Sequence, residues 1–254
     1  MPTAPPAHPT RRDIFQLAGG AAAFLALAAG PLAALAQTTP GAQPIRIATI
    51  GAGREGGALG SLFVKAGHKV MFSSRHPEQL KDLVAGLGPL AQAGTVAEAI
   101  AFGDVVLLVV PYPAVLEIGK EHGGALAAKA LVIDVSNPSA PRDGEDIVKW
   151  ANEEGGAGLA TAKALPGAHV VRAFNAIGST QLAALAHRPG EPVGIPIAGD
   201  DQNALALASR LITEIGFEPV AIGGLAMGKY LVPRTPLAGV HTPEEIRQIA
   251  ATLK

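Results

Sequence analysis

The chain has no cysteine and few aromatic residues, with one tryptophan, two tyrosines and seven phenylalanines among 254 residues. The lack of cysteine excludes disulfide bonds, thiolate catalysis and zinc or iron–sulfur sites built on cysteine. No charge of one sign dominates, because 20 Lys and Arg stand against 21 Asp and Glu. We therefore expect neither a nucleic-acid-binding protein nor a polybasic membrane surface. The histidines at 122, 169, 187 and 241 are too scattered to suggest a metal site.

Residues 1–36 have the composition of an export signal. Arg11 and Arg12 precede a stretch at residues 14–36 that has no charged residue and ends in the small-residue sequence Ala-Leu-Ala. A charged region, an apolar region and small residues, in this order, are typical of a signal peptide. The arginine pair and the apolar residues after it resemble the twin-arginine export motif, although Gln16 replaces its usual basic residue. We expect a periplasmic protein cleaved near Ala36, and an uncleaved leader that anchors the protein in the membrane is the alternative.

Short apolar runs alternate with helical patterns through the rest of the chain. Strands are expected at residues 45–50, 69–72, 105–110, 130–135, 169–174, 193–198 and 218–222. Helices are expected at residues 57–66, 78–85, 96–101, 114–119, 177–186, 202–215 and 243–253. Residues 139–167 are interpreted as a mobile, partly helical crossover. This alternation predicts an α/β fold, a Rossmann-type doubly wound and mainly parallel sheet in a single domain.

The predicted domain spans residues 45–231, after a linker at residues 37–44 and before a C-terminal tail with a short helix at residues 232–254. No long helical stretch follows residue 222, unlike in many two-domain dehydrogenases. Any substrate site must therefore come from loops or from a partner subunit, and we expect a homodimer.

A glycine-rich loop follows the first apolar run directly and precedes a helix. Its glycines predict a dinucleotide site: Gly51 for a tight turn, Gly53 for close approach of the pyrophosphate, and Gly56 for close packing of helix and strand. The free N–H groups at the start of the helix would receive the phosphates. The candidate residues here are Gly51, Ala52, Gly53, Arg54, Glu55 and Gly56.

The end of the second expected strand indicates which dinucleotide binds. An NAD-binding protein usually places an acidic residue there, whereas an arginine favours the 2′-phosphate of NADP. This chain has Ser73, Ser74 and Arg75 at that point and no acid. The alternative is that these residues form only a polar turn leading to a helix at Pro77. The preceding glycine loop favours the NADP interpretation.

Further candidates follow later strands, because ligands of such sheets bind outside the carboxyl ends of the strands. Val110 and Pro111 would form an apolar platform against the nicotinamide, or the proline only holds a turn. Ser136 and Asn137 would hydrogen-bond ribose or carboxamide, or form an Asx-type turn before a proline. Asn175 is the candidate at the end of the fifth expected strand.

With these positions in place, residues 45 to about 231 resemble the NADPH-dependent reductases of coenzyme F420, a deazaflavin. The glycine loop, Ser73 to Arg75, and the sequences ending in Asn-Pro138 and Phe-Asn175 carry the resemblance. It implies that Ser74 and Arg75 hold the 2′-phosphate, and Ala52 replaces a threonine that is frequent in the family. Related nucleotide domains occur in pyrroline-5-carboxylate reductases and membrane metalloreductases.

The resemblance implies an exported NADP-dependent oxidoreductase that transfers hydride between NADPH and a deazaflavin, a flavin or another small redox acceptor. Such a transfer needs orientation and exclusion of water but no catalytic side chain from the protein, and no metal site is expected. Two alternatives stay open. One is an imine or small carbonyl reductase related to pyrroline-5-carboxylate reductase, and the other is a non-catalytic NADP-binding redox sensor.

The export signal gives a direct prediction. Replacing Arg11 and Arg12 by lysines retains the charge but removes the guanidinium pair, so the full-length protein should stay inside the cell. Immunoblots of periplasmic and cytoplasmic fractions measure this. Continued export of the double-lysine variant would contradict the twin-arginine assignment.

Overall fold

The computed structural model describes Met1 and residues 43–254. The predicted signal peptide, beyond Met1, and the predicted linker up to residue 42 lie outside the described residues. Gln43–Lys254 form one compact unit. Within the described part of the chain, no helix is long and apolar enough to cross a membrane.

Eight strands form one sheet in the order β3-β2-β1-β4-β5-β6-β7-β8. Neighbouring strands from β3 to β6 pair in parallel, β7 pairs antiparallel with β6, and β8 is parallel to β7. This arrangement confirms the predicted α/β, doubly wound and mainly parallel sheet. The strands are β1 (Arg46–Ile50), β2 (Lys69–Ser73), β3 (Ala91–Gly94), β4 (Val105–Leu108), β5 (Leu131–Asp134), β6 (Val170–Arg172), β7 (Gly194–Gly199) and β8 (Glu218–Gly223).

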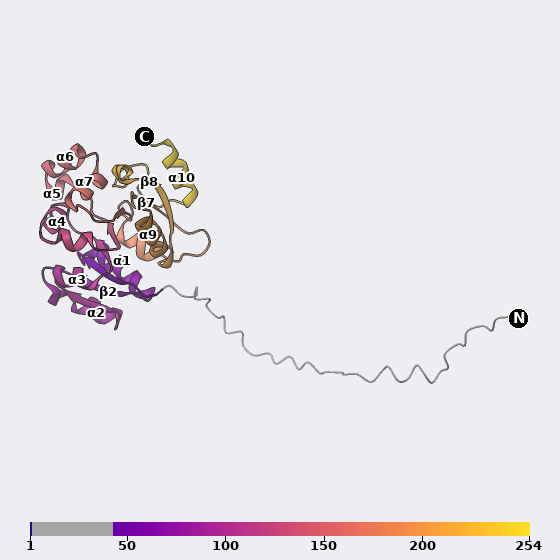
Figure 1. The fold of residues 1–254 in the computed structure, drawn as a ribbon, viewed down its shortest axis with the longest axis horizontal. Coiled ribbons are helices and arrows are strands. Elements are labelled where there is room, and N and C mark those ends of the chain that lie inside the picture. The colour runs from indigo at the N-terminus through magenta and orange to yellow at the C-terminus, as the bar shows by residue number, and fades with distance from the viewer. Residues whose placement is uncertain (2–42) are drawn as a thin grey trace, which may run out of the picture. The chain divides into compact units, whose positions relative to one another are not determined.

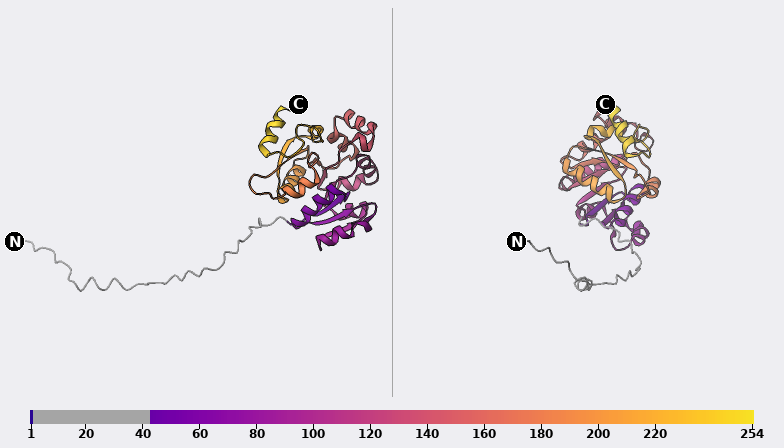
Figure 2. Two further views of the ribbon diagram at one scale, coloured as in Figure 1. Left: turned by 180° about the vertical axis from the view of Figure 1, so that it is seen from behind. Right: turned by 90° about the vertical axis from the view of Figure 1, so that its right-hand side faces the viewer.

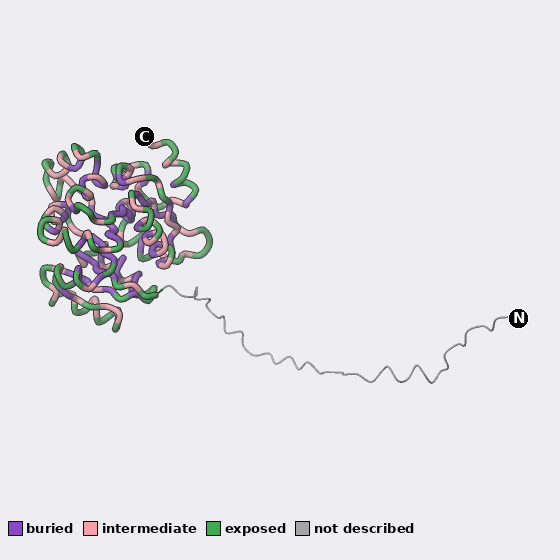
Figure 3. The backbone as a smooth tube through the Cα atoms, viewed as in Figure 1, coloured by how far each residue is buried: buried purple, intermediate pink, exposed green. Residues whose placement is uncertain are grey.

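Helices cover both faces of the sheet (Figures 1 and 2). Successive strand residues point to opposite faces, so Ile47 packs on one side and Ala48 on the other. The first face carries α1 (Arg54–Lys65), η1 (Pro77–Leu80), α2 (Lys81–Leu87), α8 (Ser179–Leu185) and α9 (Gln202–Glu214). The second carries α3 (Val96–Phe102), α4 (Tyr112–Ala127), α6 (Glu145–Glu153), α7 (Ala157–Ala164) and η2 (Leu225–Tyr230). Figure 3 shows buried segments gathered in the interior and exposed ones around them.

Three elements differ from the sequence-based expectations. β3 was not expected, because its sequence Ala-Gln-Ala-Gly has no β-branched residue, and it forms by pairing in parallel with β2. α4 extends eight residues beyond the expected end at residue 119, as its bounds Tyr112–Ala127 show. Residues 139–167 form the three helices α5 (Ala140–Asp143), α6 and α7, so this crossover is largely helical. The expected C-terminal helix is present as α10 (Pro243–Thr252).

A buried ion pair joins the ends of two neighbouring strands. Arg172 of β6 and Asp134 of β5 are both 0% exposed, and Arg172 Nη1 lies 2.5 Å from Asp134 Oδ2. Arg172 also donates to the carbonyl oxygens of Ser136 at 2.9 Å and Leu231 at 3.0 Å, and to Asn137 Oδ1 at 2.8 Å. The guanidinium therefore fixes the segment after β5 and the segment after η2 in one arrangement.

The second face of the sheet completes this network. Asp134 accepts hydrogen bonds from the Ser136 N–H and from the Thr161 hydroxyl of α7, both at 2.8 Å. The Tyr112 hydroxyl lies 3.0 Å from Thr161 Oγ1 and donates to the Ala157 carbonyl at 2.9 Å. Burial, and then the charge of Asp134, raise the pKa of Tyr112 to about 12. Tyr112 is thus a neutral hydrogen-bond donor at any physiological pH.

This network predicts a large loss of stability when its cation is removed. Arg172→Met leaves the Asp134 carboxylate buried without its countercharge, so the free energy of unfolding should fall by about 3–5 kcal/mol. Urea unfolding followed by circular dichroism measures it.

The matched control is Arg46→Met, which breaks the exposed pair between Arg46 Nη2 and Asp104 Oδ1 at 2.6 Å. Both side chains of that pair are about half exposed, and its loss should cost less than about 1 kcal/mol. Equal losses in the two variants would show that the buried pair does not stabilise the fold as described.

Candidate functional site

Two glycines of the loop between β1 and α1 are required by packing. Gly51 has φ of +95°, and a Cβ there would lie 2.2 Å from the Val109 carbonyl oxygen. A Cβ at Gly56 would lie 1.9 Å from the Gly51 carbonyl oxygen. At Gly53, by contrast, no atom lies within 4 Å of the position that a Cβ would take. Gly51 and Gly56 therefore allow the loop to turn and the helix to pack, whereas Gly53 leaves open space that a ligand could occupy.

The start of α1 offers unpaired backbone donors. Gly53 caps the helix without a side-chain hydrogen bond, and the first N–H groups of a helix have no partner within the helix. Together with the positive end of the helix dipole, they form a site for an anion such as a pyrophosphate. The Ala52 N–H does not contribute, because it donates to the Ser73 carbonyl at 3.1 Å.

The same hydrogen bond places the end of β2 beside the glycine loop. Ser73 is 0% exposed and its hydroxyl is buried without a partner in the described structure, so this side chain does not reach the surface. Ser74 Oγ accepts from the His76 N–H at 3.0 Å, which closes a tight turn. Arg75 is exposed, and no ion pair of its guanidinium occurs within residues 43–254. Of the three predicted 2′-phosphate ligands, Ser74 and Arg75 are thus the accessible ones.

A cleft of about 550 Å³ lies at the carboxyl ends of the strands, beside the glycine loop. This edge of the sheet is where the strand order reverses between β1 and β4, which is where ligands bind in doubly wound folds. The predicted residues that line it are Gly53, Arg54, Glu55, Gly56, Val110, Pro111, Ser136, Asn137 and Asn175. The predicted residues Gly51, Ala52, Ser73, Ser74 and Arg75 do not line it.

The polar groups after β5 serve the fold as well as the cleft. The Ser136 hydroxyl donates to the Leu108 carbonyl at 3.3 Å. Asn137 Nδ2 donates to the Asn175 carbonyl at 2.7 Å, while its Oδ1 accepts from Arg172. Both ends of the Asn137 amide are therefore occupied by contacts within the fold, although neither contact is the Asx-type turn that was the alternative for this residue. The Asx-type turn is present too, but Asp134 forms it by accepting the Ser136 N–H.

Asn175 differs because half of its amide is unpaired. The residue is 6% exposed, and Nδ2 donates to the Asp134 carbonyl at 3.0 Å. Oδ1 has no hydrogen-bond partner among the described residues. The preceding Phe174 has φ of +65°, a conformation that a bulky residue rarely adopts, and its ring stays in the core 6.2 Å from that of Phe217. The chain thus leaves β6 under strain at the wall of the cleft, as functional sites often do.

Several residues of the cleft were missed by sequence reasoning. Four precede or begin α8, and Arg142 and Pro233 approach from α5 and from the segment after η2. The sequence did indicate the residues near α8, because Gly178 and Ser179 form an ordinary helix start shortly after the predicted site residue Asn175. Arg142 donates to the Asn137 carbonyl at 2.6 Å, a contact that no sequence pattern indicates.

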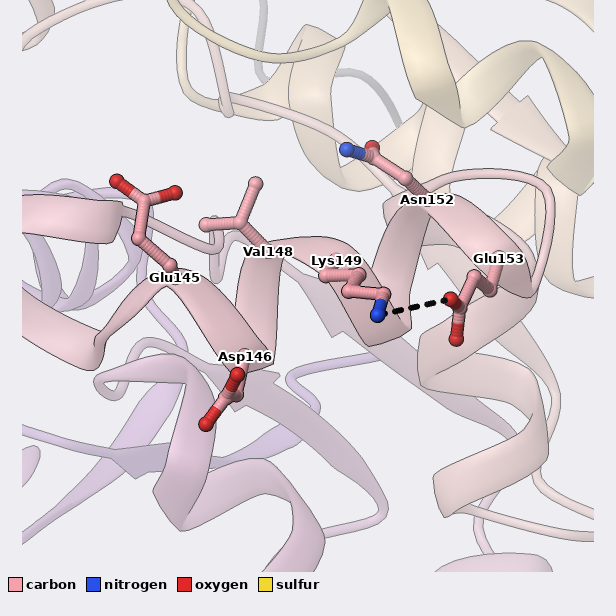
Figure 4. A pocket seen from close by; sticks show the side chains of 6 residues that line it. All are labelled: Glu145, Asp146, Val148, Lys149, Asn152 and Glu153. Carbon is pink, nitrogen blue, oxygen red and sulfur yellow. Dashed lines mark ion pairs between the residues drawn. The ribbon is translucent and has the colours of Figure 1, made fainter.

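A second hollow of about 520 Å³ lies along α6 (Figure 4). All six residues that line it belong to this one helix, and an exposed pair joins Lys149 Nζ to Glu153 Oε1 at 3.9 Å. No groups from other elements converge there, so this surface is not the functional site. In the described part of the chain, no group of three or more metal-ligating side chains is found.

The fold and the cleft are those of a doubly wound α/β protein with a site shaped for a dinucleotide. Residues 46–138 match the model of the family described as NADP oxidoreductase coenzyme F420-dependent. The matched segment is similar to that family over about a third of the chain, and it includes the glycine loop, Arg75 and Asn137. The match confirms the predicted resemblance, the predicted cofactor NADP and the predicted enzyme class.

Solved structures share the fold over more of the chain. A hypothetical protein from Sinorhizobium meliloti is 26% identical with a TM-score of 0.66, over 78% of this chain and 95% of that one. A protein described as an F420-dependent NADP-reductase from Arthrobacter sp. is 17% identical with a TM-score of 0.60, over 73% and 87%. An imine reductase from Pseudomonas sp. is 14% identical with a TM-score of 0.52, over 82% and 61%. The last two show the fold alone, and the comparison with curated proteins gives no match.

The accessible cation at the end of β2 predicts a preference for NADP over NAD. Arg75→Ala removes a charge-assisted hydrogen bond to the 2′-phosphate, so NADP affinity should fall roughly 10- to 100-fold while NAD affinity stays nearly constant. Fluorescence titration with the two nucleotides measures this. Arg188→Ala, at another arginine that the cleft does not include, is the control. Equal affinities of the wild type for NADP and NAD would refute the assignment.

Proposed function

We propose that this protein transfers hydride between NADPH and a deazaflavin such as coenzyme F420, and that it does so after export to the periplasm. The observation that carries the proposal is the position of the cleft, which joins the glycine loop to the ends of β4, β5 and β6. When bound, NADPH supplies the hydride. The chain's own residues then have to hold the cofactor, leave room for a second ring and exclude water.

The residues present can contact the pyrophosphate, the 2′-phosphate and the nicotinamide carboxamide of this cofactor. The open side of Gly53 and the free N–H groups of α1 suit the pyrophosphate, and Ser74 and Arg75 suit the 2′-phosphate. The unpaired Asn175 Oδ1 is an acceptor that suits the carboxamide N–H₂ of the nicotinamide. Arg54 brings a further positive charge to the mouth of the cleft.

The acceptor would lie against apolar walls. The apolar residues Val110, Pro111, Phe174 and Ile177 line the same cleft as the polar groups. After β8, the described residues contain only η2 and α10 as helices. In this proposal, loops or a second copy of the chain close the acceptor site, and a homodimer is part of the proposal.

The predicted export route is compatible with an enzyme that binds its cofactor before it leaves the cytoplasm. The twin-arginine route carries folded proteins, so NADP bound in the cytoplasm would travel with the protein. This part of the proposal rests on the sequence of residues 10–36.

Stopped-flow spectroscopy of NADPH oxidation tests the activity. The wild type should reduce coenzyme F420 faster than it reduces FMN, a quinone or a ferric chelate. Gly53→Ala should bind NADPH at least about tenfold more weakly without unfolding, because its new methyl group projects into open space that the pyrophosphate would take. Gly57→Ala is the matched control, since its Cβ meets only the Ala52 carbonyl oxygen at 3.8 Å.

The alternatives appear as distinct outcomes. Faster turnover of a cyclic imine than of F420 would contradict the deazaflavin proposal in favour of an imine reductase. Tight NADPH binding without turnover of any acceptor would contradict enzymatic function and would indicate a redox sensor.

A further inference from the structure

One ionisable group of the cleft has no part in the function proposed above. Glu55 lies in the first turn of α1 and lines the cleft together with Gly53, Asn175 and Ser179. Its Oε1 is buried and has no hydrogen-bond partner among the described residues. A buried carboxylate oxygen without a partner is costly when ionised, so this environment favours the neutral acid.

The surroundings of Glu55 oppose this effect only in part. Burial raises the pKa of Glu55, while hydrogen bonding from Ser179 of α8 and the positive charge of Arg54 lower it by smaller amounts. Arg142 is the other charged residue that lines the cleft, and it is paired with Asp143 at 2.7 Å. α8, which packs against α1, has no ionisable side chain, and neither do the residues directly after β4, β5 and β6 that line the cleft. The charged residues at the ends of β5 and β6, Asp134 and Arg172, are paired with each other and do not line the cleft.

A bound dinucleotide would shift this balance further. Its pyrophosphate would lie at the start of α1, within the same turn as Glu55, and two negative groups at short distance disfavour ionisation of the carboxyl. We propose that Glu55 takes up a proton when NADP binds and holds it in the cleft for delivery to the acceptor. The proposal rests on the function proposed above, because it needs the pyrophosphate at α1.

Reduction of the acceptor consumes a proton as well as a hydride. A ring acceptor that receives a hydride at carbon gains two electrons and a negative charge, which a ring nitrogen neutralises by binding a proton. The O–H bond of the Glu55 carboxyl breaks and an N–H bond on the acceptor forms. The resulting carboxylate regains a proton from water at the open side of the cleft. Atoms and charge balance with the acceptor, NADPH and one proton from solvent.

Isothermal titration calorimetry of the full-length protein with NADP measures the proton uptake directly. Titrations in two buffers with different ionisation enthalpies give the number of protons bound with the ligand. The wild type should take up more protons than Glu55→Gln, by up to one, and Glu55→Met should match Glu55→Gln. The 2′-phosphate titrates equally in all variants, so it cancels in the difference. Glu153→Gln, at an exposed position of α6 that does not line the cleft (Figure 4), should behave as the wild type.

The pH dependence of affinity has a definite sign. A carboxyl whose pKa is higher in the complex than in the free protein makes binding weaker as the pH rises between the two values. The wild-type Kd should therefore rise by up to about tenfold per pH unit in that range relative to Glu55→Gln. At a pH within that range, where the Glu55 carboxyl of the complex still holds its proton, Glu55→Gln should reduce F420 roughly 100-fold more slowly than the wild type at saturating NADPH.

The outcomes separate the two proposals. If the wild type does not bind NADP, the function and the role of Glu55 both fail. If the wild type binds NADP with the same proton uptake as Glu55→Gln, the role of Glu55 alone is overturned. Equal rates of F420 reduction in the two proteins would likewise exclude proton delivery by Glu55, with NADP binding intact.

Discussion

The buried pair between Asp134 and Arg172 is the interaction on which the rest of the cleft depends. Neither residue is exposed, and the groups around them come from β5, β6, α7 and the segment after η2. Arg172 holds the Ser136 carbonyl and the Asn137 side chain, and Asp134 holds the Ser136 N–H. The peptide backbone that forms the cleft floor is thereby fixed before any ligand binds, which reduces the ordering cost of binding.

On the glycine-loop side of the cleft, a ligand would meet backbone N–H groups and the room left by the glycines rather than charged side chains. Gly51 and Gly56 allow the turn and the helix packing, and Gly53 leaves room for a ligand. In the proposed function, phosphate recognition relies on N–H groups of α1, with Ser74 and Arg75 as accessible side chains at the end of β2. A site of this kind orients its ligands, which is the main contribution that hydride transfer requires of a protein.

Sequence reasoning found the parts of the site that depend on local pattern. The glycine loop and the strand ends were visible because a strand, a turn and a helix have distinct periods and turn residues. The ion pair was not, since 38 positions separate Asp134 from Arg172 and only the parallel pairing of β5 and β6 brings them together. The burial of the Ser73 hydroxyl and the formation of β3 likewise depend on tertiary packing, which overrides local propensity.

The most direct test of this account is a crystal structure of the full-length protein with NADP. The account predicts the pyrophosphate over the N–H groups at the start of α1, the 2′-phosphate beside Arg75 and the nicotinamide in the cleft next to Asn175. A dinucleotide bound elsewhere, or bound in the cleft with its 2′-phosphate turned away from Arg75, would contradict it.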